Sequence, residues 1–579
     1  MIKQGRFRRL AILSAIVGAV AAAAAVVAVA AVIPNSVTKI AAGEDRSAEV
    51  FAQLDPEKPK NIMLLILDGF DDQMMTAARN YLVGANGRFL MDDLPFTGDV
   101  TVHGVNPAAS PPYPPNYVND SAATAAAIAT GHKTLEGRLS QGPSAGISIP
   151  GTDYPSVMLL HKAAGKKVAN ISTVDLTDAT PAAFGSSINY RDCQGPQNMG
   201  SCPSARKVNG GKGSIAEQLV DNGIDVLFGG GRDRYLQQID AGGTALDYAT
   251  EELGYRYVST RNEMNAIESL DDGPVLGLFS SGYMTTRFAP LIASASGSGG
   301  STYRCTTQNR GTQPTLAEMT AKAIELVENP NGFFLMAESA SVDKREHAGD
   351  ICGSIGEVGE AEDALQVMLD YQEEHPDTLI VVTADHGHAT QIVRNSNEAK
   401  FTGTVQTEDG RPMTIGYSVG TSAGGQWHTG TQLRVAAKGP QAANVLGTID
   451  QTDIFHILMG LEPSSVPDPD PNPDPEPEVP KPTVKIAALK SMVKPKLKKT
   501  GVPVSVIAAD TTSFRVQLFH GGIKLGDKNF AGKSSGDVTF KINKSKFKKI
   551  QVGGLRIEVH ATGPGGKKTF TRSIKLTKK

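Results

Sequence analysis

The stretch Asn61-Ile-Met-Leu-Leu-Ile-Leu67, followed by Asp68-Gly69, decides the fold. It is a short, uninterrupted apolar run, which is typical of a strand buried on both faces of a sheet. Similar runs lie at 168–174, 226–228, 332–337 and 378–383, and helical patterns lie between them or after them at 315–328, 359–375 and 450–461. Strands that alternate with helices predict an α/β fold, with three layers (α/β/α) and a mostly parallel central sheet.

The pattern changes beyond residue 461. Prolines alternate with acidic residues from 466 to 480, which holds the chain extended and makes 463–482 a linker. From 483 to 579, segments of alternating apolar and polar residues are separated by glycine pairs, which predicts a small all-β, sandwich-like domain. This stretch carries 22 Lys and Arg against four acidic residues, a net charge of +18, whereas the rest of the chain carries −21. We therefore expect an acidic catalytic domain at 60–462 and a basic β domain at 483–579.

The first 33 residues are typical of a targeting segment. Basic residues up to Arg9 precede an uncharged run from Leu10 to Ile33, and this charge bias places the body of the protein outside the cytoplasm. The run is long enough to span a bilayer, yet it is mostly alanine, and Ala28-Val29-Ala30 offers a cleavage pattern. A cleaved signal peptide and a retained membrane anchor both fit. We expect residues 34–59 to be an exposed linker, and the protein to be secreted or held at the cell surface.

The chain has four cysteines, Cys193, Cys202, Cys305 and Cys352. An even number in an exported chain favours disulfides, and four cysteines allow three connectivities. Cys193 with Cys202 is the local pairing, which leaves Cys305 with Cys352. Free buried thiols are the alternative, whereas a cysteine-only metal site is disfavoured because no CxxC motif is present.

Acidic residues follow four of the apolar runs. Asp68 ends the first run, Asp178 follows the second, Glu338 ends the fourth and Asp385 ends the fifth. Open α/β sheets place their sites at the carboxyl ends of parallel strands. One strand-end acid often only caps the next helix. Four such acids, two of them with histidines nearby, indicate a functional site.

The histidines point to metal binding. Asp343 and His347 stand four residues apart, so on a helix they share one face and can bind one cation, although a surface ion pair would have the same spacing. Asp385 and His386 add adjacent oxygen and nitrogen ligands, a mixture that suits zinc. His428 lies in a glycine-rich loop and offers one more imidazole.

A candidate nucleophile stands at the start of an alanine-rich helical pattern. In the stretch 117–131, Asp120 and Ser121 open the pattern and Gly131 ends it. A serine hydroxyl at a helix N-terminus lies near unpaired N–H groups and the positive end of the helix dipole, where an anion is favoured. For this stretch taken alone, a simple helix cap is the competing interpretation.

Together these motifs resemble the bacterial alkaline phosphatases, in order and from about Lys60 to Leu461. The matching motifs are Asp68-Gly69, Asp120-Ser121-Ala-Ala, Asp178-Ala-Thr-Pro-Ala-Ala183, Glu338 with Ser341-Val-Asp343-Lys344 and His347, Thr383-Ala-Asp385-His386, and His428-Thr-Gly-x-Gln-Leu-Arg434. The resemblance implies an alkaline phosphatase-like fold and an exported enzyme that hydrolyses phosphate monoesters through a phosphoserine intermediate. Because members of the family are commonly dimers, a homodimer is also expected.

The resemblance further implies roles for individual residues. Asp343, His347 and His428 would hold one zinc ion, and Asp385, His386 and Asp68 would hold a second. Asp178, Thr180 and Glu338 would complete a magnesium site beside Asp68, an all-oxygen set that suits a hard cation.

Three residues would act on the phosphate itself. Ser121 would be the nucleophile. Arg191, thirteen residues after Asp178, would grip two phosphate oxygens. Lys344 would assist near the phosphate, with a simple ion pair to Asp178 as the alternative.

Three other functions are alternatives to phosphate monoester hydrolysis. A sulfatase of the same superfold needs a modifiable Cys or Ser followed by Pro and Arg, which Ser121-Ala-Ala-Thr-Ala lacks. A phosphodiesterase is less consistent with the Arg191 clamp and the full third-metal set. A catalytically silent surface-binding protein is the alternative from a different class, and the presence of every expected ligand argues against it.

The basic C-terminal domain has ligand alternatives of its own. Its charge could hold it to an anionic cell-envelope polymer, to lipid headgroups or to nucleic acid, or it could have no ligand. Because the domain carries no aromatic-rich nucleic-acid motif, we expect no specific nucleic-acid partner.

Overall fold

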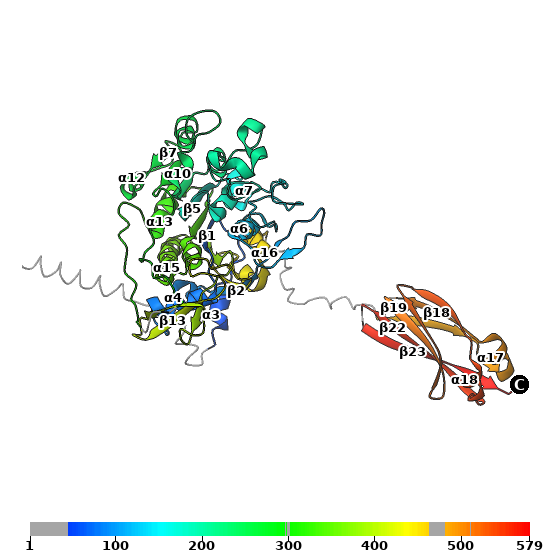
Figure 1. Cartoon of the computed structure of the whole chain (residues 1–579). Helices are drawn as coiled ribbons and strands as arrows, with labels where there is room; N and C mark the ends of the chain where they lie inside the picture. The colour runs from blue at the N-terminus through cyan, green and yellow to red at the C-terminus, as the bar shows by residue number, and fades with distance from the viewer. Residues whose placement is uncertain are drawn as a thin grey trace, which may run out of the picture. The chain divides into compact units, whose positions relative to one another are not determined.

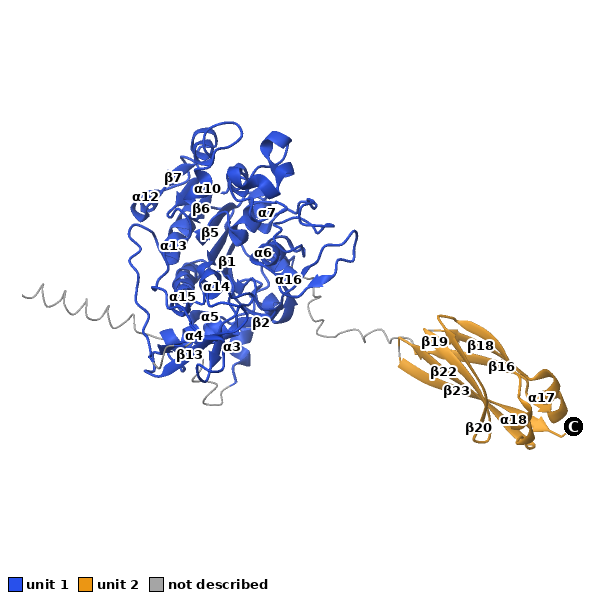
Figure 2. Ribbon diagram, in the orientation of Figure 1, with its two compact units in different colours: residues 1–463 blue, residues 464–579 orange. Residues whose placement is uncertain are grey.

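The computed structural model describes residues 45–295, 297, 301–462, 481–509, 511–564 and 566–578. The chain divides into two compact units, 1–463 and 464–579 (Figure 2). The expected targeting segment at 1–33 and the proline-rich stretch at 463–480 lie outside the described residues. In the described part of the expected linker, one short helix forms, α3 (Ser47–Phe51). None of the described helices combines the length and hydropathy of a membrane span.

A ten-stranded sheet organises unit 1 (Figure 1). Its strands, in spatial order, are β15 (Gly447–Asp450), β2 (Phe96–Thr101), β14 (Leu433–Lys438), β10 (Thr378–Ala384), β1 (Asn61–Leu67), β9 (Phe333–Ser339), β5 (Lys167–Asp175), β6 (Val226–Gly230), β8 (Val275–Leu278) and β7 (Arg256–Val258). All strands from β10 to β7 run parallel, and β14 runs antiparallel to both of its neighbours. The mostly parallel sheet predicted from the sequence is confirmed.

Helices pack on both sides of this sheet, which completes the predicted three layers (Figure 1). One layer contains α4 (Asp72–Leu82), α13 (Leu316–Val327), α14 (Ser341–His347) and α15 (Ile351–Glu374). The other contains α6 (Ser121–Thr130), α7 (Val157–Ala163), α8 (Ala179–Gly185), α9 (Ile215–Asp221) and α16 (Gln451–Met459).

Smaller elements complete unit 1. The short helices include α5 (Leu90–Asp93), α10 (Arg232–Tyr235), α11 (Ala245–Asp247) and α12 (Arg261–Asn265). A separate small sheet has the order β11 (Gln391–Val393), β13 (Pro412–Tyr417) and β12 (Phe401–Gln406), and β3 (Gly104–Val105) pairs with β4 (Pro115–Asn116).

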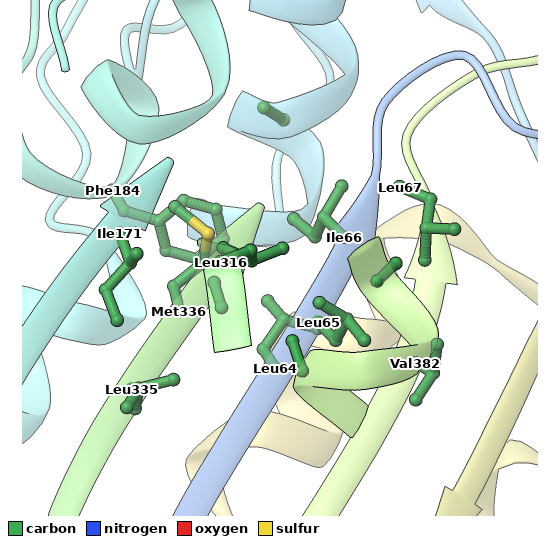
Figure 3. Close-up of a cluster of buried hydrophobic side chains, with 14 of the residues drawn as sticks. Leu64, Leu65, Ile66, Leu67, Ile171, Phe184, Leu316, Leu335, Met336 and Val382 are labelled. Carbon is green, nitrogen blue, oxygen red and sulfur yellow. The ribbon is translucent and has the colours of Figure 1, made fainter. Parts of the chain in front are cut away.

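Strand β1 lies at the centre of the core and is buried along its whole length. Leu64 is level with Met336 of β9, and Leu65 is level with Val382 of β10 (Figure 3). Full burial of one such side chain stabilises the fold by roughly 1.5–3 kcal/mol. The apolar run at 61–67 is therefore the strand around which both helical layers pack.

One helix differs from its sequence pattern. The pattern predicts a helix from 359, whereas α15 begins at Ile351, where Asp350 caps it by accepting from the N–H of Gly353. Every residue from Ile351 to Ala361 is buried. A helix that is buried all round shows no amphipathic period, so only its later, half-exposed turns were visible in the sequence.

Both predicted disulfides are present. Cys193 is bonded to Cys202, in the loop that follows α8. Cys305 is bonded to Cys352, which ties an extended segment to the first turn of α15. The described residues contain no free cysteine.

Unit 2 consists of two sheets around a core of its own. The first has the order β16 (Thr483–Ala488), β18 (Val502–Ala509) and β21 (Ser535–Phe540). The second has the order β17 (Ser491–Val493), β23 (Gly566–Thr577), β22 (Gly553–Gly563), β19 (Ser513–His520) and β20 (Ile523–Ala531). Side chains from both sheets form one buried apolar cluster, as in a sandwich. The strands pair antiparallel except for β17 with β23.

Candidate active site and metal centre

Three neighbouring strands deliver carboxylates to one edge of the central sheet. Leu67, at the end of β1, is level with Ser339 of β9 on one side and with Ala384 of β10 on the other. Asp68 and Asp385 are the next residues along β1 and β10, and both are buried. Glu338, on β9, is buried as well. The parallel register therefore places these carboxylates together at the carboxyl edge of the sheet.

The turn after β1 requires glycine. Gly69 has a φ of +73°, and a Cβ atom there would lie 3.0 Å from the Cα of Asp343. The N–H of Gly69 donates to Oδ1 of Asp385 at 3.2 Å. The absence of a side chain thus lets α14, which carries Asp343, approach the strand ends closely.

Three histidines surround the carboxylate of Asp343. The Nε2 atoms of His347, His388 and His428 lie 3.4, 3.3 and 3.2 Å from its Oδ1. The ligand atoms of these four residues all lie within 4.8 Å of one another, the spacing of a metal site. Asp343 and His347 come from α14, whereas His388 and His428 come from loops.

Hydrogen bonds fix the tautomers of two of these imidazoles. Nδ1 of His347 lies 2.6 Å from the carbonyl oxygen of Gln426, and Nδ1 of His428 lies 2.8 Å from that of Asn119. A carbonyl can only accept, so each Nδ1 carries a proton, and in the neutral ring each Nε2 presents a lone pair. These two Nε2 atoms face each other at 3.0 Å. Two neutral imidazoles and a carboxylate directed at one point favour a cation between them.

His388 has the opposite tautomer. Its Nδ1 accepts from the N–H of Ala389 at 2.8 Å, so Nε2 carries the proton and points at Asp343. Burial lowers the pKa of His388 to about 3, which keeps the ring neutral. His388 can therefore orient Asp343 but cannot at the same time ligate a cation through Nε2. The sequence prediction did not include this residue, although it stands only two positions after His386.

A second group of ligand atoms joins Asp68, Asp343 and His386. Nε2 of His386 lies 3.2 Å from Oδ1 of Asp68 and 3.6 Å from Oδ2 of Asp385. Burial, followed by the charges of Asp385 and Asp343, raises the pKa of Asp68 to about 7. Burial opposes the charged form of His386, but Asp385 and Asp68 outweigh it and raise its pKa to about 10. Because these buried carboxylates repel one another, a cation among them is strongly favoured.

The hydroxyl of Ser121 faces this second group. Ser121 is the first residue of α6, and the side chain of Asp120 caps that helix. Oγ of Ser121 lies 3.1 Å from Nε2 of His386 and 3.4 Å from Oδ1 of Asp68. A buried hydroxyl at a helix N-terminus, beside metal-type ligands, is well placed to act as a nucleophile.

Two cations, Arg191 and Lys344, line the same cleft as Ser121. Arg191 donates from Nη1 to Asp120 at 3.1 Å and from Nη2 to Asp178 at 2.6 Å. Lys344 pairs with Asp343 at 3.1 Å and with Asp178 at 3.4 Å. Burial alone would raise the pKa of Asp178, but Lys344 and Arg191 outweigh it and hold the pKa below its usual range. The ion pair that the sequence offered as an alternative role for Lys344 is therefore present.

The residues expected to bind magnesium are less tightly gathered. Glu338 accepts from the hydroxyl of Ser172 at 2.6 Å, and burial, followed by Asp68 and Asp178, raises its pKa well above the usual range. Oγ1 of Thr180 is buried and has no hydrogen-bond partner among the described residues. Asp178, in contrast, forms ion pairs with Arg191 and Lys344. Neither group of closely spaced ligand atoms includes Asp178 or Glu338.

A cleft of about 410 Å³ opens over these residues. Ser121, Arg191, Lys344, His347 and His428 all line it, together with Trp427 and Tyr283. The volume lies within the usual range for a small-molecule site. The site thus combines a hydroxyl, two fixed cations and two clusters of metal-type ligands around one opening, which suits the transfer of an anionic group.

Comparisons with known proteins agree with this chemistry. A family model described as alkaline phosphatase matches residues 59–423. The alkaline phosphatase of Escherichia coli (strain K12) is 41% identical over 425 residues, which cover 72% of this chain and 88% of that protein. Streptomycin-6-phosphate phosphatase of Streptomyces griseus is 39% identical over 417 residues, which cover 69% and 90%.

A solved structure supports the fold. The alkaline phosphatase of Thermus thermophilus superposes with a TM-score of 0.52 at 20% identity, over 74% of this chain and 95% of that one. At this identity the likeness concerns the fold alone. Because the family model matches residues 59–423 and the sequence match covers most of the chain, this protein belongs to the alkaline phosphatase family and is a phosphomonoesterase.

Proposed function

We propose that this enzyme hydrolyses phosphate monoesters through a covalent phosphoserine at Ser121. The proposal rests mainly on one observation: the buried Ser121 hydroxyl lies beside His386 and Asp68, in a cleft that Arg191 and Lys344 also line. Oγ attacks phosphorus, the alcohol departs, and water then releases inorganic phosphate from the serine. Each step exchanges one oxygen on phosphorus for another.

The chain's own residues bind and orient the phosphate. The guanidinium of Arg191, held in place by Asp120 and Asp178, can donate to two phosphate oxygens at once. The ammonium of Lys344 adds a positive charge on the same side. The N-terminus of α6 favours negative charge on Oγ of Ser121. These groups offset the charge of a phosphate dianion that would otherwise repel the nucleophile.

We further propose two zinc ions and one magnesium ion in this site. Asp343, His347 and His428 supply the oxygen and nitrogen ligands that zinc favours, and Asp68, Asp385 and His386 supply a second set. Asp178, Thr180 and Glu338 offer only oxygen, which suits magnesium. When bound, such ions stabilise the charges on the attacking and leaving oxygens.

The nucleophile assignment is tested by Ser121→Ala. We expect turnover of a generic aryl phosphate to fall by at least about 10³-fold, while metal content, measured by inductively coupled plasma mass spectrometry, stays at that of the unmodified protein. Acid quenching during turnover should trap phosphate on Ser121 in the unmodified enzyme and not in the variant. Wild-type rates in Ser121→Ala would contradict the assignment.

We also propose that the basic C-terminal unit binds an anionic cell-envelope polymer. Its helices α17 (Lys494–Thr500) and α18 (Lys544–Lys548) lie at one end of the unit (Figure 1), where Nζ of Lys494 donates to the carbonyl of Ile550 and lies 5.5 Å from the ring centre of Phe547. We call this the lysine end; its members are Lys494, Lys496, Lys498, Lys499, Lys544, Lys546, Lys548 and Lys549.

The charges at the lysine end have few anionic partners. Two acids of unit 2 are already paired elsewhere, Asp527 with Arg515 and Lys524, and Glu558 with Arg556. Neither helix exposes a large apolar side chain that could insert into a bilayer. Clustered, exposed lysines without such an anchor favour a flexible polyanion over a membrane.

Matched double variants test this binding surface. On immobilised inorganic polyphosphate, Lys498→Gln/Lys548→Gln should elute at lower salt than Lys567→Gln/Lys568→Gln, which removes the same charge from the β22–β23 hairpin end. Equal elution of the two would contradict a localised surface.

The two disulfides support a location outside the cytoplasm, since such bonds persist in oxidising compartments. The expected homodimer stays a prediction, which light scattering on the purified protein would check.

A further inference from the structure

Trp427 is the single tryptophan of the chain, and it stands in the wall of the catalytic cleft. Its side chain is 63% exposed. An indole is large and mostly apolar, so its exposure to water is unfavourable. Contact with an apolar part of a ligand would remove this cost. A second aromatic side chain of the same wall, Tyr283, is 46% exposed.

The backbone on both sides of Trp427 is fixed. Gln426 is fully buried; its side chain accepts from the N–H of Gly420 at 3.0 Å and donates to the carbonyl of Ser422 at 2.6 Å. On the other side, His428 is held by its hydrogen bond to the carbonyl of Asn119. Trp427 is therefore an exposed ring on a rigid support, not the tip of a loose loop.

The metal-ligand cluster sets the orientation of the ring. The indole meets the imidazole of His347 edge to face, with ring centres 5.9 Å apart. One imidazole thus separates Trp427 from the atoms that surround Asp343. Trp427 lines the same cleft as Ser121 and Arg191.

The cleft has two chemically different parts. Arg191 and Lys344 suit the phosphate, and the nucleophile lies beside them. The indole of Trp427 carries no charge, and its ring can contact the alcohol that remains after the phosphate is placed. Aromatic faces bind flat rings by stacking without requiring a particular pattern of hydrogen bonds.

We infer that Trp427 forms a subsite for a flat, aromatic alcohol portion of the substrate, such as a nucleoside or an aryl alcohol. This inference rests on the proposed function, because it assumes that the phosphate lies at Ser121. The inference assigns a preference for the alcohol portion of the substrate. The other residues described in the site suit phosphate and metals.

A matched substrate pair tests the subsite. Adenosine 5′-monophosphate and ribose 5-phosphate both lose phosphate from a primary 5′-oxygen, and only the first carries a base. In Trp427→Ala, the ratio of kcat/KM for the nucleotide to kcat/KM for the sugar phosphate should fall by about tenfold. Trp427→Phe, which keeps a flat ring, should retain most of the ratio. Tyr303→Ala removes an exposed aromatic outside the cleft and should leave the ratio unchanged.

A direct binding measurement needs no variant and no turnover. Because Trp427 is the only tryptophan, intrinsic indole fluorescence reports on this ring alone. Adenosine should quench it in a saturable manner in the metal-loaded enzyme, and ribose should not. This measurement keeps the subsite separate from the proposed chemistry, since adenosine carries no phosphate to transfer.

Two results would overturn the inference. One is the absence of saturable quenching by adenosine. The other is an equal loss of kcat/KM for both substrates in Trp427→Ala, which would mean that the indole only supports His347.

Discussion

The guanidinium of Arg191 is fixed between two carboxylates before any substrate binds. Asp120 accepts from Nη1 and Asp178 accepts from Nη2. The backbone N–H of Arg191 donates to the carbonyl of Gly137 at 2.7 Å. Such a group loses little entropy when it binds phosphate, because its rotamer is already set. The same carboxylates must share Arg191 with the ligand, so they also limit how tightly phosphate is held.

Replacement of the Arg191 guanidinium by the ammonium group of a lysine is expected to weaken phosphate binding. In Arg191→Lys, the inhibition constant of inorganic phosphate should rise by about tenfold, since one charge-assisted hydrogen bond of a bidentate pair is lost. Competitive inhibition of aryl phosphate hydrolysis measures it. Arg206→Lys, at an exposed pair with Asp240, is the control. An unchanged inhibition constant, with unchanged metal content, would exclude Arg191 as the clamp.

Glu357, buried on α15, makes stability depend on pH. Burial, followed by the neighbouring Glu360, raises the pKa of Glu357 to about 7. The folded chain therefore holds a proton that the unfolded chain releases, so this contribution to stability is complete below about pH 4.5 and is lost as pH rises through 7.

Glu357→Gln should remove that decline. Between pH 5 and pH 8, the free energy of unfolding of the unmodified protein should fall by about 2 kcal/mol more than that of the variant, measured by urea denaturation. Parallel pH profiles for the two proteins would show that Glu357 is ionised in the folded state.

Among the single elements, the sequence predicts the buried strands and the acidic residues that follow them. β1 and β10 are short apolar runs with acids directly after them, so their place in the sheet and the position of Asp68 and Asp385 follow from the pattern. The antiparallel direction of β14 does not follow, because a six-residue run carries no sign of direction. His388 and Trp427 were missed because only tertiary contacts bring them to their neighbours Asp343 and His347.

The two disulfides are expected to have different effects. Cys305–Cys352 closes 47 residues and Cys193–Cys202 closes nine. By loop entropy the first should stabilise by about 4 kcal/mol and the second by about 3 kcal/mol. Cys193, however, lies two residues from Arg191. We expect Cys305→Ser/Cys352→Ser to lower the melting temperature more, and Cys193→Ser/Cys202→Ser to weaken phosphate inhibition more. The reverse order, from calorimetry and inhibition assays, would contradict this division.

At the scale of the whole molecule, two cores make two units. The buried apolar side chains form one cluster in unit 1 and another in unit 2, with no shared member among the described residues. All the clustered ligands belong to unit 1. The cleft and the proposed polymer-binding surface therefore lie in units that have separate cores.

Removal of the second unit should leave the enzyme intact. A chain ended at residue 462 should keep kcat/KM for an aryl phosphate within about twofold, because no residue of the cleft is lost. Calorimetry of the full chain should show two transitions, and only one should remain after truncation. A large loss of activity on truncation would mean that the units depend on each other.

The level pairing of Leu67 with Ser339 and Ala384 sets a limit on how the gene can vary in length. Loss of one codon within β1 would draw Asp68 back by about 3.3 Å and turn its side chain to the opposite face, while its partners on β9 and β10 stayed in place. The length of each of these three short strands is therefore constrained together with the identity of the ligands that they carry.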